Sequence, residues 1–418
     1  MSPESQLAVS EHLTTEFDEV LRSGVRCVYQ PFVDLDTGSI VAHEALLRGP
    51  AGTPWESPMV LLAAAAGAHR VSDLERQSLR RSLTDAATQS RGRPMTLFVN
   101  LEPSTLTGSP DVVIDALAHC PSNVQVVVEI TERALAADVA GVLSGAEKLR
   151  AAGCAIALDD VGVEPESLAF IPLLRPEIVK LDLGLLRSVS DLATVSVAGA
   201  VRAYAEATGA EVVAEGIETP RDLTRALVLG ATLGQGWLWG RPDGTLAPAI
   251  YVPERFQSSP VTPLLRATPF ELIERSRWTR RAPKQLLMPL SRSMEAVALA
   301  ARVPPLLLAG FEDARFFTPA TAARYTTLAQ RLPFVCALGK GMPAAPAPGV
   351  RGQALSDDDP LAREWTVVVL AAHESAALIA RDLGDEGPDG DRQFEFVVTY
   401  DRATVTAAAQ SLVGRLVS

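Results

Sequence analysis

The first 250 residues alternate between short apolar runs and longer stretches in which apolar residues recur every three or four positions. Short apolar runs predict buried strands, and the longer spacing predicts amphipathic helices. The predicted strands are residues 25–34, 39–48, 95–100, 124–130, 156–160, 177–182, 211–216 and 233–239. The predicted helices are residues 11–22, 58–69, 72–90, 111–119, 137–152, 166–174, 193–208 and 220–229. About eight strands, most of them separated by helices, predict a closed (β/α)8 barrel.

The first two predicted strands differ from the others because no helix separates them. The short segment between them, Asp36-Thr37-Gly38, has the composition of a tight turn. We therefore expect an antiparallel hairpin at the start of an otherwise parallel barrel.

The pattern changes after the proline-rich segment 260–269. Beyond it, helices are predicted at 270–277, 289–301 and 403–416, strands at 305–310, 366–371 and 394–398, and loops at 339–352 and 382–391. This predicts a smaller α/β domain with its own core. The predicted organisation is an N-terminal extension at 1–14, a barrel domain at 15–255, a linker at 256–268 and a second domain at 269–418.

Composition narrows the class of protein. The chain has 418 residues, 47% of them hydrophobic, and a formal net charge of −12, which disfavours nucleic acid and anionic membrane surfaces as partners. The four cysteines are isolated from one another, as in a reducing compartment. No apolar segment suggests a signal peptide or a membrane span, so we predict a cytoplasmic protein without membrane contact.

Polar residues lie near the ends of the predicted strands of the barrel. They are Glu44, Asn100, Glu129, Asp159, Asp160, Lys180, Glu215 and Gln235. A single acid after a strand is more often a helix cap or a solvated loop residue. Eight polar residues at successive strand ends favour a common site, because the carboxyl ends of parallel strands meet at one face of a barrel.

Five carboxylates and one amide oxygen are ligands that suit Mg²⁺ or Mn²⁺ better than zinc. So many acids predict two ions, with Asp159 as the bridging ligand, and two such ions can clamp a phosphate and activate a water. Lys180 is placed to hold that water or to offset charge on the phosphate. His43 is expected to face away from Glu44 because side chains alternate along a strand. The residues alone predict metal-dependent phosphodiester hydrolysis.

Glu44-Ala-Leu-Leu-Arg48 is the signature of EAL-domain proteins, which hydrolyse the bacterial messenger cyclic di-GMP to linear pGpG. The resemblance covers residues 15–255 and includes Tyr29-Gln-Pro31, Asn100-Leu-Glu-Pro103, Glu129-Ile-Thr-Glu132, Asp159-Asp160, Lys180-Leu-Asp182, Ala214-Glu-Gly-Ile-Glu218 and Gly234-Gln-Gly-Trp-Leu-Trp-Gly-Arg-Pro242. It implies a TIM-type barrel with an antiparallel first strand and a homodimer.

The resemblance also implies a role for each matching position. The implied metal ligands, for two Mg²⁺ or Mn²⁺ ions, are Glu44, Asn100, Glu129, Asp159, Asp160 and Glu215. Catalysis is assigned to Lys180, Glu44 and Glu215, and contacts with cyclic di-GMP to Gln30, Arg48 and Gln235. Glu132 is expected to tether the loop that follows the aspartate pair.

That loop, Val161–Ser167, departs from the family pattern D-D-F-G-T-G-Y-S-S. Val161 replaces Phe, Glu164 replaces a glycine, and Pro165 replaces Tyr. A Glu-Pro pair constrains the backbone where glycine would leave it free. An alternative therefore stays open, in which the chain binds cyclic di-GMP or a protein partner as a signalling module without efficient hydrolysis.

The second domain resembles the DICT domain, a presumed sensory module. The resemblance rests on Ser291-Arg-Ser-Met-Glu295, on Phe311 with Arg315-Phe316, and on Asp357-Asp-Asp-Pro-Leu-Ala-Arg-Glu-Trp365. It implies an unknown ligand or protein partner that modulates the barrel. The basic stretch 275–284 is more typical of a solvated connection than of a nucleic-acid site, given the acidic chain.

Overall fold

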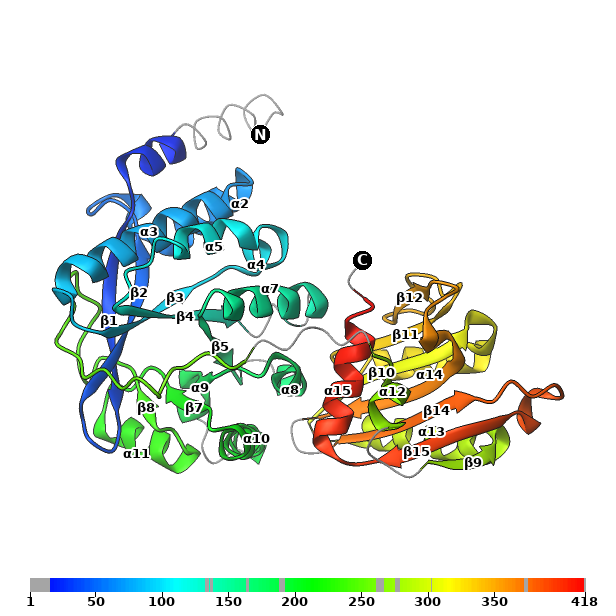
Figure 1. Ribbon diagram of the computed structural model, residues 1–418. Coiled ribbons are helices and arrows are strands. Elements are labelled where there is room, and N and C mark those ends of the chain that lie inside the picture. Colours follow the sequence, from blue (N-terminus) through cyan, green and yellow to red (C-terminus); the bar gives the residue numbers. More distant parts are fainter. Residues whose placement is uncertain are drawn as a thin grey trace, which may run out of the picture.

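The computed structural model describes residues 16–131, 135, 138–162, 165–187, 192–260, 267–274, 279–301, 303–371 and 375–416. These residues form two bodies, each built on one β-sheet (Figure 1). The first is a closed eight-stranded barrel, and the second is a seven-stranded open sheet. Within the described part of the chain, no helix has both the length and the apolar character needed to cross a bilayer.

The barrel strands follow one another around the barrel in sequence order. They are β1 (Arg26–Asp34), β2 (Ile40–Arg48), β3 (Met95–Asn100), β4 (Val124–Thr131), β5 (Ala155–Val161), β6 (Ile178–Leu181), β7 (Glu211–Ala214) and β8 (Leu233–Gly234). Strand β1 is antiparallel to both of its neighbours, β2 and β8, and the other adjacent pairs are parallel. The predicted barrel with an antiparallel first strand is confirmed.

Helices cover the outside of the barrel (Figure 1). They are η1 (Pro54–Glu56), α2 (Pro58–Gly67), α3 (Val71–Ser90), α4 (Pro103–Gly108), α5 (Pro110–Leu117), α7 (Val139–Ala151), η2 (Pro165–Phe170), α8 (Ile171–Leu174), α9 (Leu183–Arg187), α10 (Leu192–Thr208) and α11 (Pro220–Leu229). Residues 16–23 are also helical. The sequence marks α11 clearly, with a capping box between Thr219 and Asp222 and an αL cap at Gly230. The pattern missed α4 and α9, which are too short to show helical periodicity.

Alternation along the strands sends one set of side chains into the barrel. Phe32, Phe98 and Phe256 meet there, with the rings of Phe98 and Phe256 edge to face at 5.4 Å. Phe256, the first residue of the predicted linker, thus packs inside the barrel. The last strand is shorter than the predicted 233–239, because Gly236 turns the chain at a φ of 156° directly against the backbone of Ile217.

The second sheet has the order β12-β11-β10-β13-β14-β15-β9. Its strands are β9 (Arg280–Pro283), β10 (Leu306–Asp313), β11 (Val335–Lys340), β12 (Arg351–Leu355), β13 (Glu364–Leu370), β14 (Ser375–Asp382) and β15 (Gln393–Thr399). Its helices are α12 (Pro269–Glu274), α13 (Lys284–Ala300), η3 (Ala314–Phe316), α14 (Pro319–Ala329), η4 (Pro360–Arg363), η5 (Asp389–Asp391) and α15 (Arg402–Val413). Eight of these elements were not predicted, namely β9, β11, β12, β14, α14 and the short helices η3, η4 and η5. Alanine and threonine are frequent in β14 and α14, so the apolar contrast between their faces is weak.

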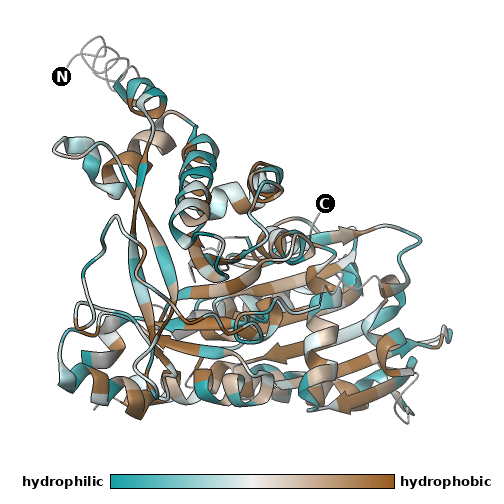
Figure 2. Cartoon of the chain, turned by 60° about the vertical axis from the view of Figure 1, so that its left-hand side comes forward, coloured by the Kyte–Doolittle hydropathy of each residue, from teal (hydrophilic) through white to brown (hydrophobic). Residues whose placement is uncertain are grey.

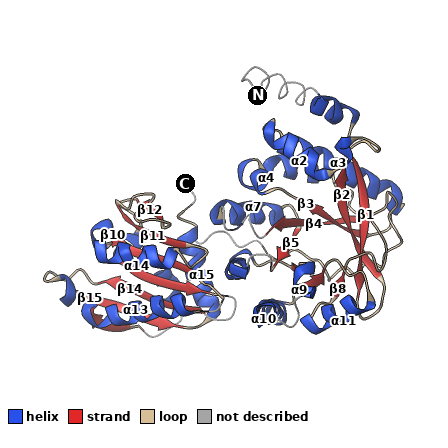
Figure 3. Cartoon of the chain, turned by 180° about the vertical axis from the view of Figure 1, so that it is seen from behind, coloured by secondary structure: helices blue, strands red, loops and turns tan. Residues whose placement is uncertain are grey.

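The two faces of this sheet serve different cores. Leu307, Ala309 and Phe311 of β10 pack with α13 and α14 in a core of their own. Leu306 and Leu308 belong to the larger cluster that includes α12, α15 and the outer shell of the barrel. Helix α15 accordingly lies on the side of the sheet that faces the barrel (Figures 1 and 3), and the apolar colouring concentrates along the strands of both bodies (Figure 2).

The buried acid Glu364 of β13 gives this domain a predicted pH dependence. Its side chain accepts a hydrogen bond from the Phe270 backbone N–H at 3.0 Å, and burial raises its pKa from 4.5 to about 7. Between these values the folded state holds a proton that the unfolded state releases, so the native state loses stability as pH rises. This shift corresponds to roughly 3 kcal/mol.

We expect Glu364→Gln to gain in thermal midpoint relative to the wild type as pH rises from 4.5 to about 7, and the gain to level off above that. Differential scanning calorimetry of both proteins across this range measures it. Glu386→Gln, at an exposed acid of the same domain, is the control and should show no such trend. A difference in thermal midpoint between wild type and Glu364→Gln that stays the same at every pH would contradict the raised pKa of Glu364.

Candidate active site at the barrel mouth

Four acids from different strands surround one lysine at the carboxyl end of the barrel. The ammonium of Lys180 on β6 lies 2.7 Å from Glu129 Oε1, 2.8 Å from Glu215 Oε1, 3.1 Å from Asp159 Oδ1 and 3.9 Å from Glu44 Oε2. The Lys180 side chain is 1% exposed and that of Glu129 is fully buried. Glu44 lies midway along β2, the other residues lie at or near the carboxyl ends of β4, β5, β6 and β7, and the barrel brings all of them together.

The carboxylate of Glu44 is held from both sides by amides. Asn100, the last residue of β3, donates from Nδ2 to Glu44 Oε1 at 2.7 Å. Gln235, the residue after β8, donates from Nε2 to Glu44 Oε2 at 2.8 Å. These two hydrogen bonds, one from the end of β3 and one from just after β8, fix the orientation of the Glu44 carboxylate.

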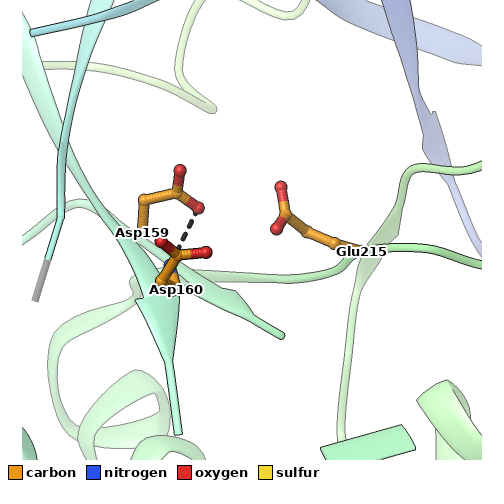
Figure 4. A group of neighbouring side chains, drawn as sticks. All are labelled: Asp159, Asp160 and Glu215. Carbon is orange, nitrogen blue, oxygen red and sulfur yellow. Dashed lines mark hydrogen bonds between the residues drawn. The ribbon is translucent and has the colours of Figure 1, made fainter. Parts of the chain in front are cut away.

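Asp159 and Asp160 face Glu215 across the mouth of the barrel (Figure 4). One carboxylate oxygen from each of the three lies within 4.8 Å of the others. Asp160 has a φ of 60°, and its backbone N–H donates to Asp159 Oδ1 at 2.9 Å. Strict alternation would send Asp160 to the outside of the barrel, and this left-handed residue instead keeps both acids at the mouth.

Burial and mutual repulsion shape the charges of this cluster. Burial, followed by the nearby Glu44, raises the pKa of Glu129 well above its usual range. Burial also raises the pKa of Glu215, to about 8, against the opposing effect of Lys180. For Lys180, burial alone would lower the pKa, but the four surrounding acids together raise it well above its usual value. The site therefore has more acid than a single ammonium can neutralise.

The residues present suit divalent metal ions. The Glu129 Oε2 atom is buried and accepts no hydrogen bond from the described residues. The available donors are all oxygen atoms, and the cluster carries surplus negative charge in a poorly solvated place. Both features are those of a site for Mg²⁺ or Mn²⁺.

The predicted substrate contacts lie around the same mouth. Gln30 on β1 is paired directly with Glu44 on β2. Arg48 ends β2 and, with Glu44 and Asn100, lines a cavity of about 270 Å³ that is also bordered by α2 and α3. Gln235 lies on the other side of Glu44. Their roles as contacts to a dinucleotide stay predictions.

Only part of the loop after the aspartate pair can be described. Gly162 has a φ of 105°, and a Cβ there would meet the side chain of Leu185, so glycine is required at this position. Val163, Glu164 and Glu132 lie outside the described residues. The prediction that Glu132 tethers the loop is therefore not tested.

Two buried polar residues near the site were missed or left unassigned by the sequence pattern. Glu75 of α3 lines the same cavity, accepts a hydrogen bond from the Glu102 backbone N–H, and has a pKa raised by burial to about 8. It occupies an ordinary helical position, so only the tertiary structure reveals its burial. His43 faces away from Glu44, as predicted, and burial lowers its pKa to about 4.

The fold and the site define a (β/α)8 barrel with a carboxylate-rich site for divalent metal at the ends of its strands. The chain belongs to the EAL domain family, whose pattern matches residues 16–242. Residues 272–383 match the sensory domain found in diguanylate cyclases and two-component systems, called DICT.

Known proteins resemble the barrel part of the chain. The cyclic di-GMP phosphodiesterase RocR of Pseudomonas aeruginosa is 31% identical over 230 residues, which cover 51% of this chain and 56% of RocR. The probable cyclic di-GMP phosphodiesterase PdeB of Escherichia coli is 32% identical over 223 residues, covering 51% of this chain and 42% of PdeB. The match thus spans about half the length of these relatives.

Solved structures agree with the fold. The EAL domain of Xanthomonas citri FimX, in complex with c-diGMP, has a TM-score of 0.52 and 19% identity, and the match covers 60% of this chain and all of that one. The PaMucR phosphodiesterase in complex with c-di-GMP has a TM-score of 0.50 and 26% identity, covering 56% of this chain and 97% of that one. The likeness to FimX concerns the fold alone.

Proposed function

We propose that this chain hydrolyses cyclic di-GMP to linear pGpG at the mouth of the barrel, with two Mg²⁺ or Mn²⁺ ions. The observation that carries the proposal is the arrangement of Glu44, Glu129, Asp159 and Glu215 around Lys180, beside a cavity lined by Arg48. Family membership and relatives named as cyclic di-GMP phosphodiesterases support the choice of substrate.

In this reaction a water oxygen bonds to phosphorus and the bond from phosphorus to the 3′ oxygen breaks. Divalent ions, when bound, favour deprotonation of the water and stabilise charge on the leaving oxygen. The chain would hold them through Glu44, Asn100, Glu129, Asp159, Asp160 and Glu215. Lys180 orients the water and offsets charge that develops on the phosphate. Gln30, Arg48 and Gln235 position the dinucleotide.

Incubation of the purified full chain with cyclic di-GMP and Mn²⁺ tests the proposal, with the products separated by chromatography. We expect linear pGpG to accumulate and to vanish when EDTA removes the metal. Absence of linear product at high protein concentration would overturn the proposed hydrolysis. Binding of cyclic di-GMP, measured on the same protein preparation, distinguishes this function from a second candidate.

That second candidate is a signalling module that binds cyclic di-GMP without efficient turnover. The observation in its favour is the sequence of the loop Val161–Ser167, which departs from the family pattern. Saturable binding of cyclic di-GMP without linear product would support it. The predicted homodimer, the cytoplasmic location and the domain boundaries also remain proposals drawn from the sequence.

We further propose that the second domain modulates the barrel through a direct contact. The rings of Phe170, at the end of η2, and Phe334, just before β11, lie edge to face at 6.3 Å. Helix α15 also contacts α8, and the contact residues belong to one buried hydrophobic cluster. Since η2 and α8 come shortly after Asp159 and Asp160 of β5 in the chain, packing on these helices can restrain the segment that follows the aspartate pair.

We expect Phe334→Ala to lower kcat/KM for cyclic di-GMP by about fivefold, a typical size for coupling between sites. The reason is that the loop after Asp160 loses support from the second domain. Tyr400→Ala, at an aromatic residue that is 72% exposed in the same domain, is the matched control. Equal kcat/KM for wild type and Phe334→Ala, with both proteins folded, would contradict this route of modulation.

A further inference from the structure

The second domain contains a small cavity with charged and aromatic walls, remote from the barrel mouth. Its volume is about 160 Å³. It lies on the face of the second sheet that carries α13 and α14, opposite the face that carries α15. Its lining residues are Lys284, Met288, Ser291, Arg292, Glu295, Phe311, Glu312, Phe316, Thr318, Ala320, Thr321, Arg324, Trp365 and Asp389.

The inner wall of the cavity is acidic. Glu295 is 3% exposed and Glu312 is 6% exposed. Arg392 neutralises Glu312 through an ion pair at 2.6 Å. Glu295 Oε2 pairs with Arg324 Nε, Oε1 accepts a long hydrogen bond of 3.4 Å from the Ser291 hydroxyl, and the buried Tyr325 hydroxyl also lies close to Glu295. Glu295 Oε1 therefore has capacity for a cationic or N–H donor from a ligand.

The outer wall offers unused donors for an anion. Arg292 is exposed and has no ion pair among the described residues. Arg324 uses Nε for Glu295, and no partner within the described chain occupies its other two nitrogens. The N-terminal turn of the eleven-residue helix α14 opens on the same wall through Thr318, Ala320 and Thr321. Pro319 has no N–H and the Thr321 N–H is bonded to the Thr318 hydroxyl, so the two guanidinium groups, with the Ala320 N–H, are the donors that favour a carboxylate.

Aromatic side chains line the same cavity beside the paired Glu295 and Arg324. Phe311 and Trp365 are each 8% exposed, and Phe316 also lines the cavity. These surfaces suit an apolar group of a ligand.

Size limits what can enter. A dry cavity of about 150 Å³ holds a molecule as large as benzene, so about 160 Å³ holds an apolar group of roughly that size, while the charged groups of a ligand can extend toward the exposed Arg292. We propose that this cavity binds a free α-amino acid with an aliphatic side chain. Its ammonium would contact Glu295, its carboxylate would contact Arg292, Arg324 and the start of α14, and its side chain would pack on the aromatic residues. The proposal is independent of the function proposed for the barrel.

Isothermal titration calorimetry of the full chain, with leucine, isoleucine and valine as probes, tests the proposal. We expect saturable binding of at least one of them with a stoichiometry of one. The same amino acid without its carboxylate (isopentylamine for leucine) or without its amine (4-methylpentanoate) should bind at least tenfold more weakly. Absence of binding by all three amino acids, or equal binding of the one-charge analogues, would overturn the proposal.

Two variants locate the binding. Arg292→Ala removes an exposed side chain without an ion-pair partner among the described residues, so the fold should be kept while the dissociation constant rises at least tenfold. Glu295→Gln keeps the shape of the side chain and should weaken binding by a similar factor. Arg331→Ala, at an exposed arginine outside the cavity, is the control. Unchanged affinity in both cavity variants would place the ligand elsewhere and contradict the assignment.

Discussion

Glu44→Ala should abolish hydrolysis of cyclic di-GMP, with a loss of at least about 100-fold in kcat. Substitution of a residue that only supports a metal ligand typically lowers metal affinity or activity about 10–100-fold. Loss of a direct ligand should therefore lower activity further. Glu44 also accepts hydrogen bonds from Asn100 and Gln235, which would lose their shared partner. The measurement is the initial rate of pGpG formation at saturating Mn²⁺.

The substitution also has a structural effect that must be separated from the chemical one. Gln235 is 3% exposed, and leaving its amide without an acceptor costs about 1–3 kcal/mol of stability. Glu44→Gln preserves the size of the side chain and isolates the loss of charge. Glu254→Ala, at an exposed acid of the barrel, is the control for general effects. If Glu44→Ala kept an activity within tenfold of wild type, the proposed role of Glu44 as a metal ligand would be contradicted.

Lys180→Met should destabilise the metal-free protein more than any surface substitution. The Lys180 ammonium lies within 4 Å of four carboxylates, and its side chain is 1% exposed. Removing one partner from a buried ion pair typically costs about 3–5 kcal/mol, because the opposite charge remains buried without compensation. We therefore expect a lower thermal midpoint in EDTA and a large loss of activity.

Divalent metal should restore part of the lost stability, because the ions would compensate the same carboxylates. Thermal unfolding with EDTA and with Mn²⁺ measures both effects, and the stabilisation by Mn²⁺ should be larger in Lys180→Met than in wild type. Lys148→Met, at an exposed lysine of α7, is the matched control. A metal-free Lys180→Met protein as stable as wild type would mean that the acids at the barrel mouth do not repel one another.

The barrel was predictable because most of its strands are distinct apolar runs with a polar residue at or near the carboxyl end. Strand position alone assigned four residues to one site, because the carboxyl ends of the strands meet at one face of a barrel. These residues are Glu44, Asn100, Glu129 and Asp159. The pattern did not reveal that Asp160 adopts a left-handed conformation, which keeps it beside Asp159. That conformation depends on local backbone geometry and not on hydrophobic spacing.

The second domain was harder to predict for two physical reasons. Strands β11 and β14 are largely buried, with alanine frequent in β14, so they show little polar alternation, and the edge strand β12 has only five residues. Its cavity joins residues from α13, β10, α14 and β13, which are distant in the sequence. Glu75 near the barrel mouth illustrates the same limit, because a helical acid shows its burial only when the surrounding elements are in place.

Acids from separate strands of the barrel should together hold divalent ions, and the proposed hydrolysis depends on this more than on any other feature. Crystals of the full chain grown with Mn²⁺ test it most directly, through anomalous difference density collected near the manganese absorption edge. We expect a strong peak coordinated by Glu44, Asn100, Glu129 and Asp159, with a second peak beside Asp160 and Glu215 when substrate is bound. Well-ordered crystals with no manganese peak at the barrel mouth would contradict this metal site.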